Sequence, residues 1–232
     1  KRNIKMKKYL TSLLLLLLFI TSIQVKAQYN YNYSAIDYNY IDISGTGTLI
    51  AELEGVDDGL SNIIPLGDEF NFFGTKYNAV IVGSNGFLTL NTSETSSDYS
   101  NSEIPNADGP SLMIAPFWDD LTVNGAASVY YRDMGDHFIV MYENMAHYSG
   151  TNNKYFEVKL FYDTGIIEFH YDSMDLSEDS PTVGVENLAE DKGLQMHYNG
   201  SGAAINSFSA YKVSPYTVIS ASTYFGTETW TL

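Results

Sequence analysis

Two pairs of adjacent aspartates are the residues in this sequence best suited to chemistry. Asp57 and Asp58 lie in a turn between apolar runs, and Asp119 and Asp120 directly follow an aromatic segment. Paired carboxylates serve as calcium ligands, as the acid and base of a glycosidase, about 5–10 Å apart across a cleft, or as caps of backbone amides in turns. Because consecutive strand residues point to opposite faces, we interpret Asp119 and Asp120 as a turn and keep the other two uses as alternatives.

A calcium site would require the two aspartate pairs to converge. Calcium takes about six to eight oxygen ligands from carboxylates, carbonyls and water, and neither pair has the spacing of an EF-hand loop. The candidate ligands are Asp57, Asp58, Asp119 and Asp120. Calcium is the one cofactor that we predict, and magnesium should bind less well because it gives up its waters reluctantly.

The sequence lacks the motifs of common hydrolases. It has no Gly-x-Ser-x-Gly elbow, no His-Glu-x-x-His helix and no cysteine nucleophile. The histidines stand singly in or beside strand segments, where hydrogen-bonded structural histidines are common; they are His137, His147, His170 and His197. We therefore predict that the chain is not an enzyme. The competing hypothesis is a sandwich glycosidase that uses acidic residues on a concave face.

The N-terminus has the pattern of a secretory signal peptide. Two lysines precede the apolar run 13–20, and residues 25–27 (Val-Lys-Ala) supply the expected cleavage site. The apolar run is shorter than the roughly 20 residues of a membrane span. We therefore predict that residues 1–27, which include a short stretch upstream of Met6, are removed. The mature chain would start at Gln28 without a membrane span.

Charge and cysteine content narrow the partners and the compartment. Residues 1–27 contain six of the 12 basic residues and no acid, so the predicted mature chain has six bases against 28 acids and a net charge of −22. Such a chain is a poor ligand for nucleic acid. A secreted chain of this size without cysteine is held by its core alone. This favours a bacterial protein that is secreted or placed on the outer cell surface.

The apolar pattern predicts an all-β protein. Tyrosine, phenylalanine and glycine are abundant, at 19, 12 and 18 residues, and long helical periodicity is missing. Phe156 and Val158 alternate with Glu157 and Lys159, so we expect one buried face and one solvent-facing face there. Many short antiparallel strands favour a jelly-roll-like β-sandwich. A partly closed β-barrel is the alternative.

Turn signals divide the chain. Paired apolar runs over 128–145 and 154–174 predict two hairpins. We place an N-terminal strand or tether at 28–39 and the sandwich domain at 40–213. Residues 214–232 are either a last strand or the start of a truncated next module.

Two short motifs should organise the domain. Asn85-Gly86 predicts positive backbone angles in a tight hairpin, and the polar stretch 91–111 predicts a long surface loop. Pro116-Phe117-Trp118 reads as a strand segment in which Phe117 and Trp118 point to opposite faces. We expect Trp118 to enter the space between the sheets because it has the larger area to bury.

The order of these segments resembles the nidogen-like β-sandwich modules of secreted bacterial surface proteins. The resemblance runs from about Tyr40 to Val213, and its most specific parts are Ser-Asn-Gly-Phe at 84–87 and Ala-Pro-Phe-Trp-Asp-Asp at 115–120. It implies a non-catalytic extracellular module, often joined to secreted peptidases or adhesins. It also implies a structural role for Pro116-Phe117-Trp118.

These observations predict a secreted, non-catalytic module for binding, adhesion or spacing outside the cell. It could be an accessory to a surface protein or to a secreted hydrolase. The expected partner is an extracellular protein or a polysaccharide. A carbohydrate-binding module is a further alternative, because exposed tyrosines can stack on sugars while acids accept their hydroxyl groups.

Overall fold

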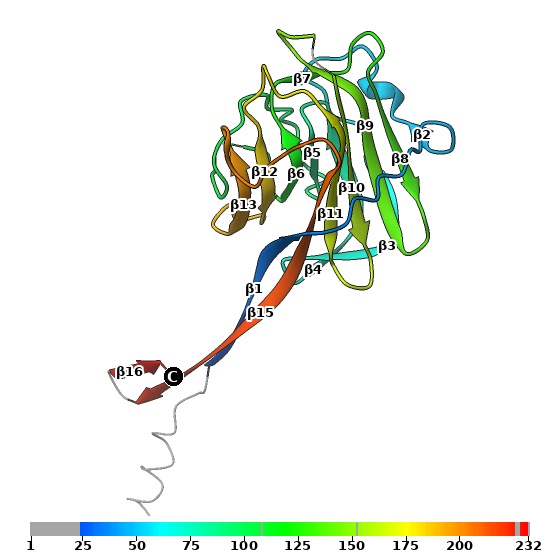
Figure 1. The fold of residues 1–232 in the computed structure, drawn as a ribbon. Helices are drawn as coiled ribbons and strands as arrows, with labels where there is room; N and C mark the ends of the chain where they lie inside the picture. The colour runs from blue at the N-terminus through cyan, green and yellow to red at the C-terminus, as the bar shows by residue number, and fades with distance from the viewer. Residues whose placement is uncertain (1–23, 108, 152, 226–227, 232) are drawn as a thin grey trace, which may run out of the picture. The chain divides into compact units, whose positions relative to one another are not determined.

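The computed structural model describes residues 24–107, 109–151, 153–225 and 228–231, and these form mainly antiparallel strands (Figure 1). The strands are β1 (Gln24–Ala35), β2 (Thr48–Leu49), β3 (Ile64–Phe72), β4 (Thr75–Gly83), β5 (Phe87–Thr89), β6 (Met113–Trp118), β7 (Leu121–Thr122), β8 (Ser128–Asp133), β9 (His137–His147), β10 (Lys154–Phe161), β11 (Ile167–Met174), β12 (Thr182–Glu186), β13 (Gly193–Tyr198), β14 (Ser201–Gly202), β15 (Ser209–Phe225) and β16 (Glu228–Thr231). One short 3-10 helix, η1 (Ala51–Leu53), precedes β3.

The chain divides into two compact units. The larger unit is Asn30–Tyr216, and the smaller one contains the described parts of Lys1–Tyr29 and Thr217–Leu232. Most of the predicted signal peptide lies outside the described residues, whereas positions 24–27 belong to β1. Among the helices of the described residues, none has the length and apolar character needed to cross a membrane.

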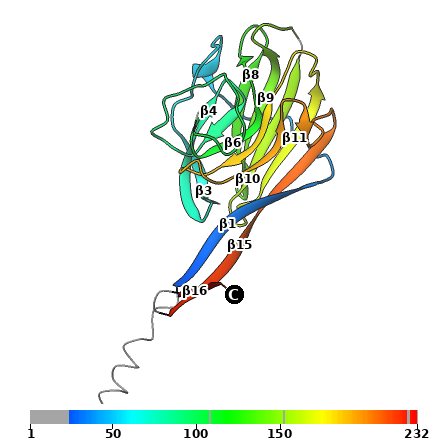
Figure 2. The same ribbon diagram turned by 90° about the vertical axis from the view of Figure 1, so that its left-hand side faces the viewer.

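Two antiparallel sheets make up the sandwich. In the described residues, one sheet has the strand order β1-β15-β11-β10-β9-β8-β2, with β16 beside β15 and β7 beside β9. The other has the order β14-β13-β12-β6-β5-β4-β3. Figure 1 shows the two layers next to each other, and Figure 2 turns the layer of β3, β4 and β6 toward the viewer. The predicted sandwich is confirmed, and the sheets do not close into the alternative barrel.

The predicted hairpins are confirmed by the strand register. In the first, Tyr130 of β8 pairs with Met141 of β9, and in the second Val158 of β10 pairs with Phe169 of β11. Gly165, in the turn of the second hairpin, has a φ of 64°. A positive φ is costly for residues with a Cβ atom, which explains a glycine there.

The core between the sheets is apolar, and two buried tyrosines bridge it. Tyr142 of β9 donates its hydroxyl hydrogen to the carbonyl groups of Gly83 (3.1 Å) and Phe87 (3.0 Å) on the other sheet. Tyr171 of β11 donates to the carbonyl of Pro116 in β6 (2.7 Å). These bonds satisfy polar groups that would otherwise be buried without partners, so they fix how the sheets face each other.

A bulge in β6 corrects the expectation for its aromatic residues. Phe117, not Trp118, enters the space between the sheets, where its ring lies 5.5 Å from that of Phe156. Trp118 is buried on the outer face of the same sheet. The register of β6 against β12 shifts between Ala115 and Trp118. Such a shift changes which side chains face inward. The expectation rested on the larger area of Trp118, and it was wrong because both rings are buried, Phe117 between the sheets and Trp118 on the outer face.

Both outer faces of the larger unit are covered by irregular segments. We call residues 36–47 the strap, which crosses β11, β10, β9 and β8 as the blue line of Figure 1. Its backbone N–H groups at Asn39, Ile41 and Ile43 donate to His170, Glu157 and Met141 on successive strands. We call residues 91–107 and 109–111 the cover loop. It lies over Trp118, and the backbone N–H of Asn106 donates a hydrogen bond to the carboxylate of Glu186 in β12.

The strap corrects a second expectation. Glu157 and Lys159 were expected to face solvent, yet both are fully buried. Their side chains form an ion pair at 3.1 Å, and Lys159 also donates to the backbone carbonyl of Asn39. Alternation correctly separated the two faces of β10, but a segment remote in sequence buries the polar one.

Candidate metal site

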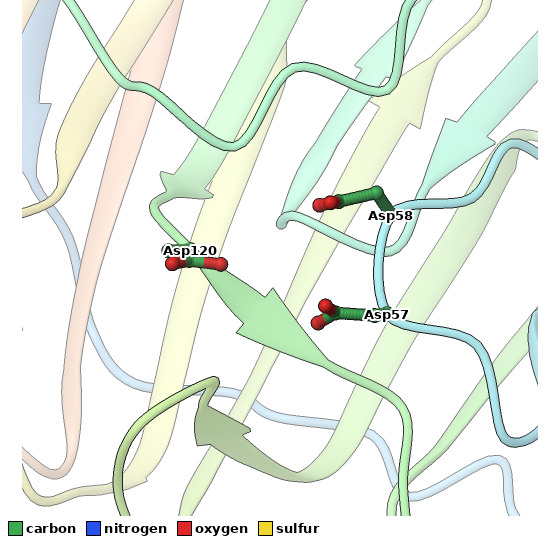
Figure 3. Close-up of side chains that lie close together, drawn as sticks. All are labelled: Asp57, Asp58 and Asp120. Atoms are coloured by element: carbon green, nitrogen blue, oxygen red, sulfur yellow. The ribbon is translucent and has the colours of Figure 1, made fainter.

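Three of the four candidate aspartates meet at one end of the sandwich. Asp57 and Asp58 lie in the loop between η1 and β3, and Asp120 lies in the turn between β6 and β7. One carboxylate oxygen of each lies within 4.8 Å of the other two. Figure 3 shows the three carboxylates directed into the space between these segments.

Asn85 holds the two acidic segments together. It is fully buried between β4 and β5, and its side-chain nitrogen donates to Asp58 (2.8 Å) and to the carbonyl of Ser97 (2.7 Å). Its side-chain oxygen accepts the backbone N–H of Leu121 (2.9 Å), and its own carbonyl accepts the N–H of Asp119 (3.2 Å). One amide therefore fixes the 57–58 loop relative to the 119–121 turn.

Gly86 permits the close approach of this connection to β6. It has a φ of 75°, whereas Asn85 has no positive φ, so only one residue of the motif behaves as predicted. A Cβ atom on Gly86 would lie 1.9 Å from the carbonyl oxygen of Phe117. The register pairs Gly83 with Phe87, which makes this a three-residue connection with glycine in the left-handed position.

Asp119 has a different task from the other three. Its carboxylate accepts the backbone N–H groups of Ser180 (2.7 Å) and Asp120 (3.0 Å). Burial raises its pKa, against the lowering effect of these two hydrogen bonds. The structure thus places Asp119 as a cap that holds the loop between β11 and β12, outside the carboxylate cluster.

Sequence reasoning missed several residues around the cluster. Ser84 accepts the N–H of Gly59 (2.8 Å) and donates to the backbone carbonyl of Asp57. Thr122 lowers the pKa of Asp57 and His147 lowers that of Asp120, in both cases against the larger effect of burial. A serine before Asn-Gly signals a turn, but no local pattern names its partner 25 residues away.

The carboxylates of the cluster destabilise one another's charges. Burial raises the pKa of Asp57, and the charges of Asp58 and Asp120 raise it further. Burial also raises the pKa of Asp120. His147 lowers this pKa, and repulsion from Asp58 raises it further. Like charges at this separation favour either protonation or a bound cation.

The residues present fit a hard divalent cation. The three carboxylates provide oxygen ligands, and Oδ1 of Asp57 is buried without a hydrogen-bond partner among the described residues. Asp58 is exposed, so water can reach the site and complete a coordination shell. Asp57, Asp58 and Asp120 are the residues that would hold calcium, which would neutralise their repulsion and join two loops.

A catalytic arrangement finds less support in the geometry. Two surface hollows, of about 270 and 240 Å³, are lined by residues around Tyr77 and around Tyr131, and neither lining includes a pair of carboxylates. Burial raises the pKa of Glu157 and of Glu186 to about 7. These two glutamates lie under the strap and the cover loop, on different sheets, so they do not face each other across a cleft.

Comparison with known proteins agrees with the fold. The nidogen-related (NIDO-related) family matches residues 29–223. Alpha-tectorin of Gallus gallus is 36% identical over 78 residues, which cover 34% of this chain but only 4% of alpha-tectorin. No solved structure matches significantly. The match to the family spans most of the sandwich, including the Asn85 connection and the aspartate turn, and the chain therefore belongs to the nidogen-related family.

Proposed function

We propose that this chain is a secreted, non-catalytic binding module whose loop end is ordered by calcium. The observation that carries the proposal is the convergence of Asp57, Asp58 and Asp120 from two segments that Asn85 holds together. Membership of the nidogen-related family supports an extracellular place for the module. The strongly acidic composition supports a cation as ligand and argues against nucleic acid.

Calcium at this site would act on the surface rather than on a substrate. The 57–58 loop and the Asp120 turn carry like charges that repel each other. A bound cation would remove this repulsion and lower the free energy of the arrangement in which both loops are ordered. An extracellular protein partner could then bind a preorganised loop end with a smaller entropic cost.

The test is a thermal melting experiment with calcium, magnesium or a chelator. A ligand at 100 times its dissociation constant stabilises the fold by about 2.7 kcal/mol, which raises the melting temperature by several degrees. Magnesium should raise it less. Asp58→Asn should abolish the calcium effect without unfolding the protein, because Asp58 is exposed.

Asp163→Asn is the matched control, since it removes the same charge from an exposed turn in the β10–β11 hairpin. It should respond to calcium as the wild type does. Identical melting curves with calcium and with chelator would contradict the calcium proposal, while binding of an extracellular partner could then still be measured separately.

Polysaccharide binding is a second candidate, favoured by one exposed aromatic pair. Phe208 is 68% exposed and holds a φ of 63°, unusual for a residue with a side chain. The centres of the Phe208 and Tyr38 rings lie 5.6 Å apart, and the ring planes are at 90° to each other. The Tyr38 hydroxyl donates a hydrogen bond to Asp172. Exposed rings beside a carboxylate suit stacking on a sugar and accepting its hydroxyl groups.

A glycan panel separates the remaining alternatives. If the aromatic pair binds sugar, Phe208→Ser should weaken retention in affinity electrophoresis, and Tyr148→Ser, at another exposed ring, should not. Release of reducing ends by the wild type would instead support the glycosidase alternative. No retention of any polysaccharide would remove this second candidate.

We also propose that the protein is exported by a bacterium and starts at Gln28 after cleavage. The motivation is the lysine-flanked apolar run and the Val-Lys-Ala sequence at 25–27. N-terminal mass analysis of secreted protein tests it. Retention of residues 6–27 in that material would defeat the proposal.

A further inference from the structure

A lysine and an aspartate meet in the interior at the end of the inter-sheet core. Nζ of Lys154 lies 3.0 Å from Oδ2 of Asp179, and both side chains are fully buried. The same nitrogen lies 6.0 Å from the centre of the Phe117 ring. Lys154 belongs to β10 of one sheet, and Asp179 belongs to the connection that leads from β11 into β12 of the other sheet.

Bond formation between these two groups requires the uncharged form of the pair. Removing an ammonium and a carboxylate from water costs several kcal/mol for each ion. Transfer of one proton across the 3.0 Å contact gives a neutral amine and a carboxylic acid, and neutral groups cost far less to bury. A neutral amine is a nucleophile, whereas an ammonium is not.

The geometry also places the two groups for reaction. Oδ2 is bonded to the Asp179 carboxyl carbon, so Nζ of Lys154 is close to that carbon as well. Reacting atoms held about 3–3.5 Å apart gain a large effective concentration. Asp119 contributes positioning, because its carboxylate accepts the N–H of Ser180 at 2.7 Å and fixes the residue next to Asp179.

We propose that Lys154 and Asp179 form an intramolecular isopeptide bond. Nζ of the neutral amine attacks the carbon of the protonated carboxyl group, and a C–N bond forms. The C–OH bond breaks, and its hydroxyl leaves with a proton from the nitrogen as one water molecule. The products are an amide and water, so the reaction needs no oxidant, reductant or activated co-substrate.

Such a bond would tie β10 of one sheet to the segment entering the other. The chain has no cysteine, so no disulfide can provide a covalent link between these segments. A cross-link between separated parts of a chain restricts the unfolded state in the same way as a disulfide does. The isopeptide would thus give the module resistance to unfolding that the hydrophobic core does not supply.

Mass spectrometry of the full chain tests the proposal directly. The intact mass should be lower than the mass calculated from the sequence by one water molecule. Trypsin should fail to cut after Lys154, and peptide 133–159 should be found joined to peptide 160–192. Free peptides 133–154 and 160–192, together with the full calculated mass, would overturn the proposal.

Two arginine variants provide the matched comparison. Lys154→Arg keeps the positive charge but cannot form the amide, so the water loss and the joined peptides should both disappear. Lys159→Arg alters the other buried lysine, which pairs with Glu157 on its own strand, and should retain both. Water loss that persists in Lys154→Arg would also overturn the proposal.

Asp119→Asn tests the positioning role. It should lower the fraction of joined peptide in freshly purified protein while the far-UV circular dichroism spectrum stays that of the wild type. An unchanged joined fraction would show that Asp119 does not position the reacting groups.

Discussion

The outer faces of both sheets are covered by irregular segments, but the two segments bury different kinds of side chain. The strap lies over an ion pair, Glu157 with Lys159, and over the fully buried His170. The cover loop lies over an apolar cluster around Trp118, to which it contributes Ile104. Both covers are irregular, so neither is held by strand pairing, and each depends on what it contacts.

The difference shows two ways of attaching a loop to a sheet. The strap brings its own backbone N–H and carbonyl groups to buried polar side chains: Asn39 donates to His170, Ile41 donates to Glu157, and the Asn39 carbonyl accepts from Lys159. The cover loop excludes water from the aromatic surface around Trp118. It also makes hydrogen bonds to the sheet, among them one from the Trp118 indole to the Asp98 carbonyl (2.8 Å) and one from the Asn106 N–H to Glu186 (2.9 Å). A segment that covers polar side chains must supply hydrogen-bond partners to them, whereas a segment that covers apolar side chains must pack closely enough to exclude water.

The largest expected effect is from removing the apolar anchor. Trp118→Ala should lower the free energy of unfolding by about 3–5 kcal/mol, because a large buried aromatic is replaced by a cavity. Phe117→Ala removes the neighbouring ring from the inter-sheet core and should cost a similar amount. Urea denaturation of both variants measures this. A Trp118→Ala loss below about 1 kcal/mol would mean that the cover loop does not depend on the indole.

Breaking the polar cover should cost somewhat less. Lys159→Met leaves Glu157 buried without its cation and should lower the free energy of unfolding by about 3 kcal/mol. The double variant Glu157→Gln with Lys159→Met removes both charges and should cost less than the sum of the two single changes. A double-mutant cycle by urea denaturation measures the coupling. Strict additivity would contradict the view that these two charges compensate each other.

The two covers should also share a pH dependence. Burial raises the pKa of Glu186 from 4.5 to about 7, so between these pH values the folded chain holds a proton that the unfolded chain has lost. Its contribution to stability is complete below pH 4.5 and is lost as the pH rises through 7. Glu157 shifts in the same direction, with Lys159 opposing it.

Glu186→Gln isolates the share of the pH dependence that comes from the glutamate under the cover loop. The variant should lose less stability than the wild type between about pH 5 and pH 8, as measured by denaturation midpoints. Glu178→Gln, at an exposed acid, serves as the control. If the wild-type stability rose across this pH interval and Glu186→Gln removed the rise, the pH dependence would be opposite to the one expected from a raised Glu186 pKa. That result would refute the assignment.

The smallest effect separates the two adjacent aspartates. Asp119→Asn weakens a charge-assisted bond to Ser180 and should cost about 1 kcal/mol. Asp120→Asn removes a repelling charge from the cluster and should leave the calcium-free protein as stable as the wild type. Thermal melting in chelator compares them. Equal destabilisation by both changes would mean that the pair acts as one structural unit.

Local patterns were enough for the strands and for part of the site. The β8–β9 and β10–β11 hairpins follow from alternation and turn residues, and both occur in the structure. The sequence allowed the prediction that the two acidic loops converge. It did not allow the prediction that Asp120 joins the carboxylate cluster while Asp119 binds backbone N–H groups instead. This difference between the two aspartates depends on Asn85, whose backbone carbonyl accepts the N–H of Asp119, and on Ser180, whose N–H donates to Asp119 from 61 residues away.

By itself, the sequence determined the all-β class, the two-sheet arrangement and the inward face of β10, because these depend on side-chain alternation within single strands. Only the tertiary structure decided which ring of β6 enters the core, which charges are buried, and which carboxylates meet. The bulge in β6 changes the phase of alternation after Ala115. The strap and the cover loop bury residues on faces that strand patterns alone assign to solvent. Burial by a remote segment is a property of chain topology, and no short-range pattern encodes it.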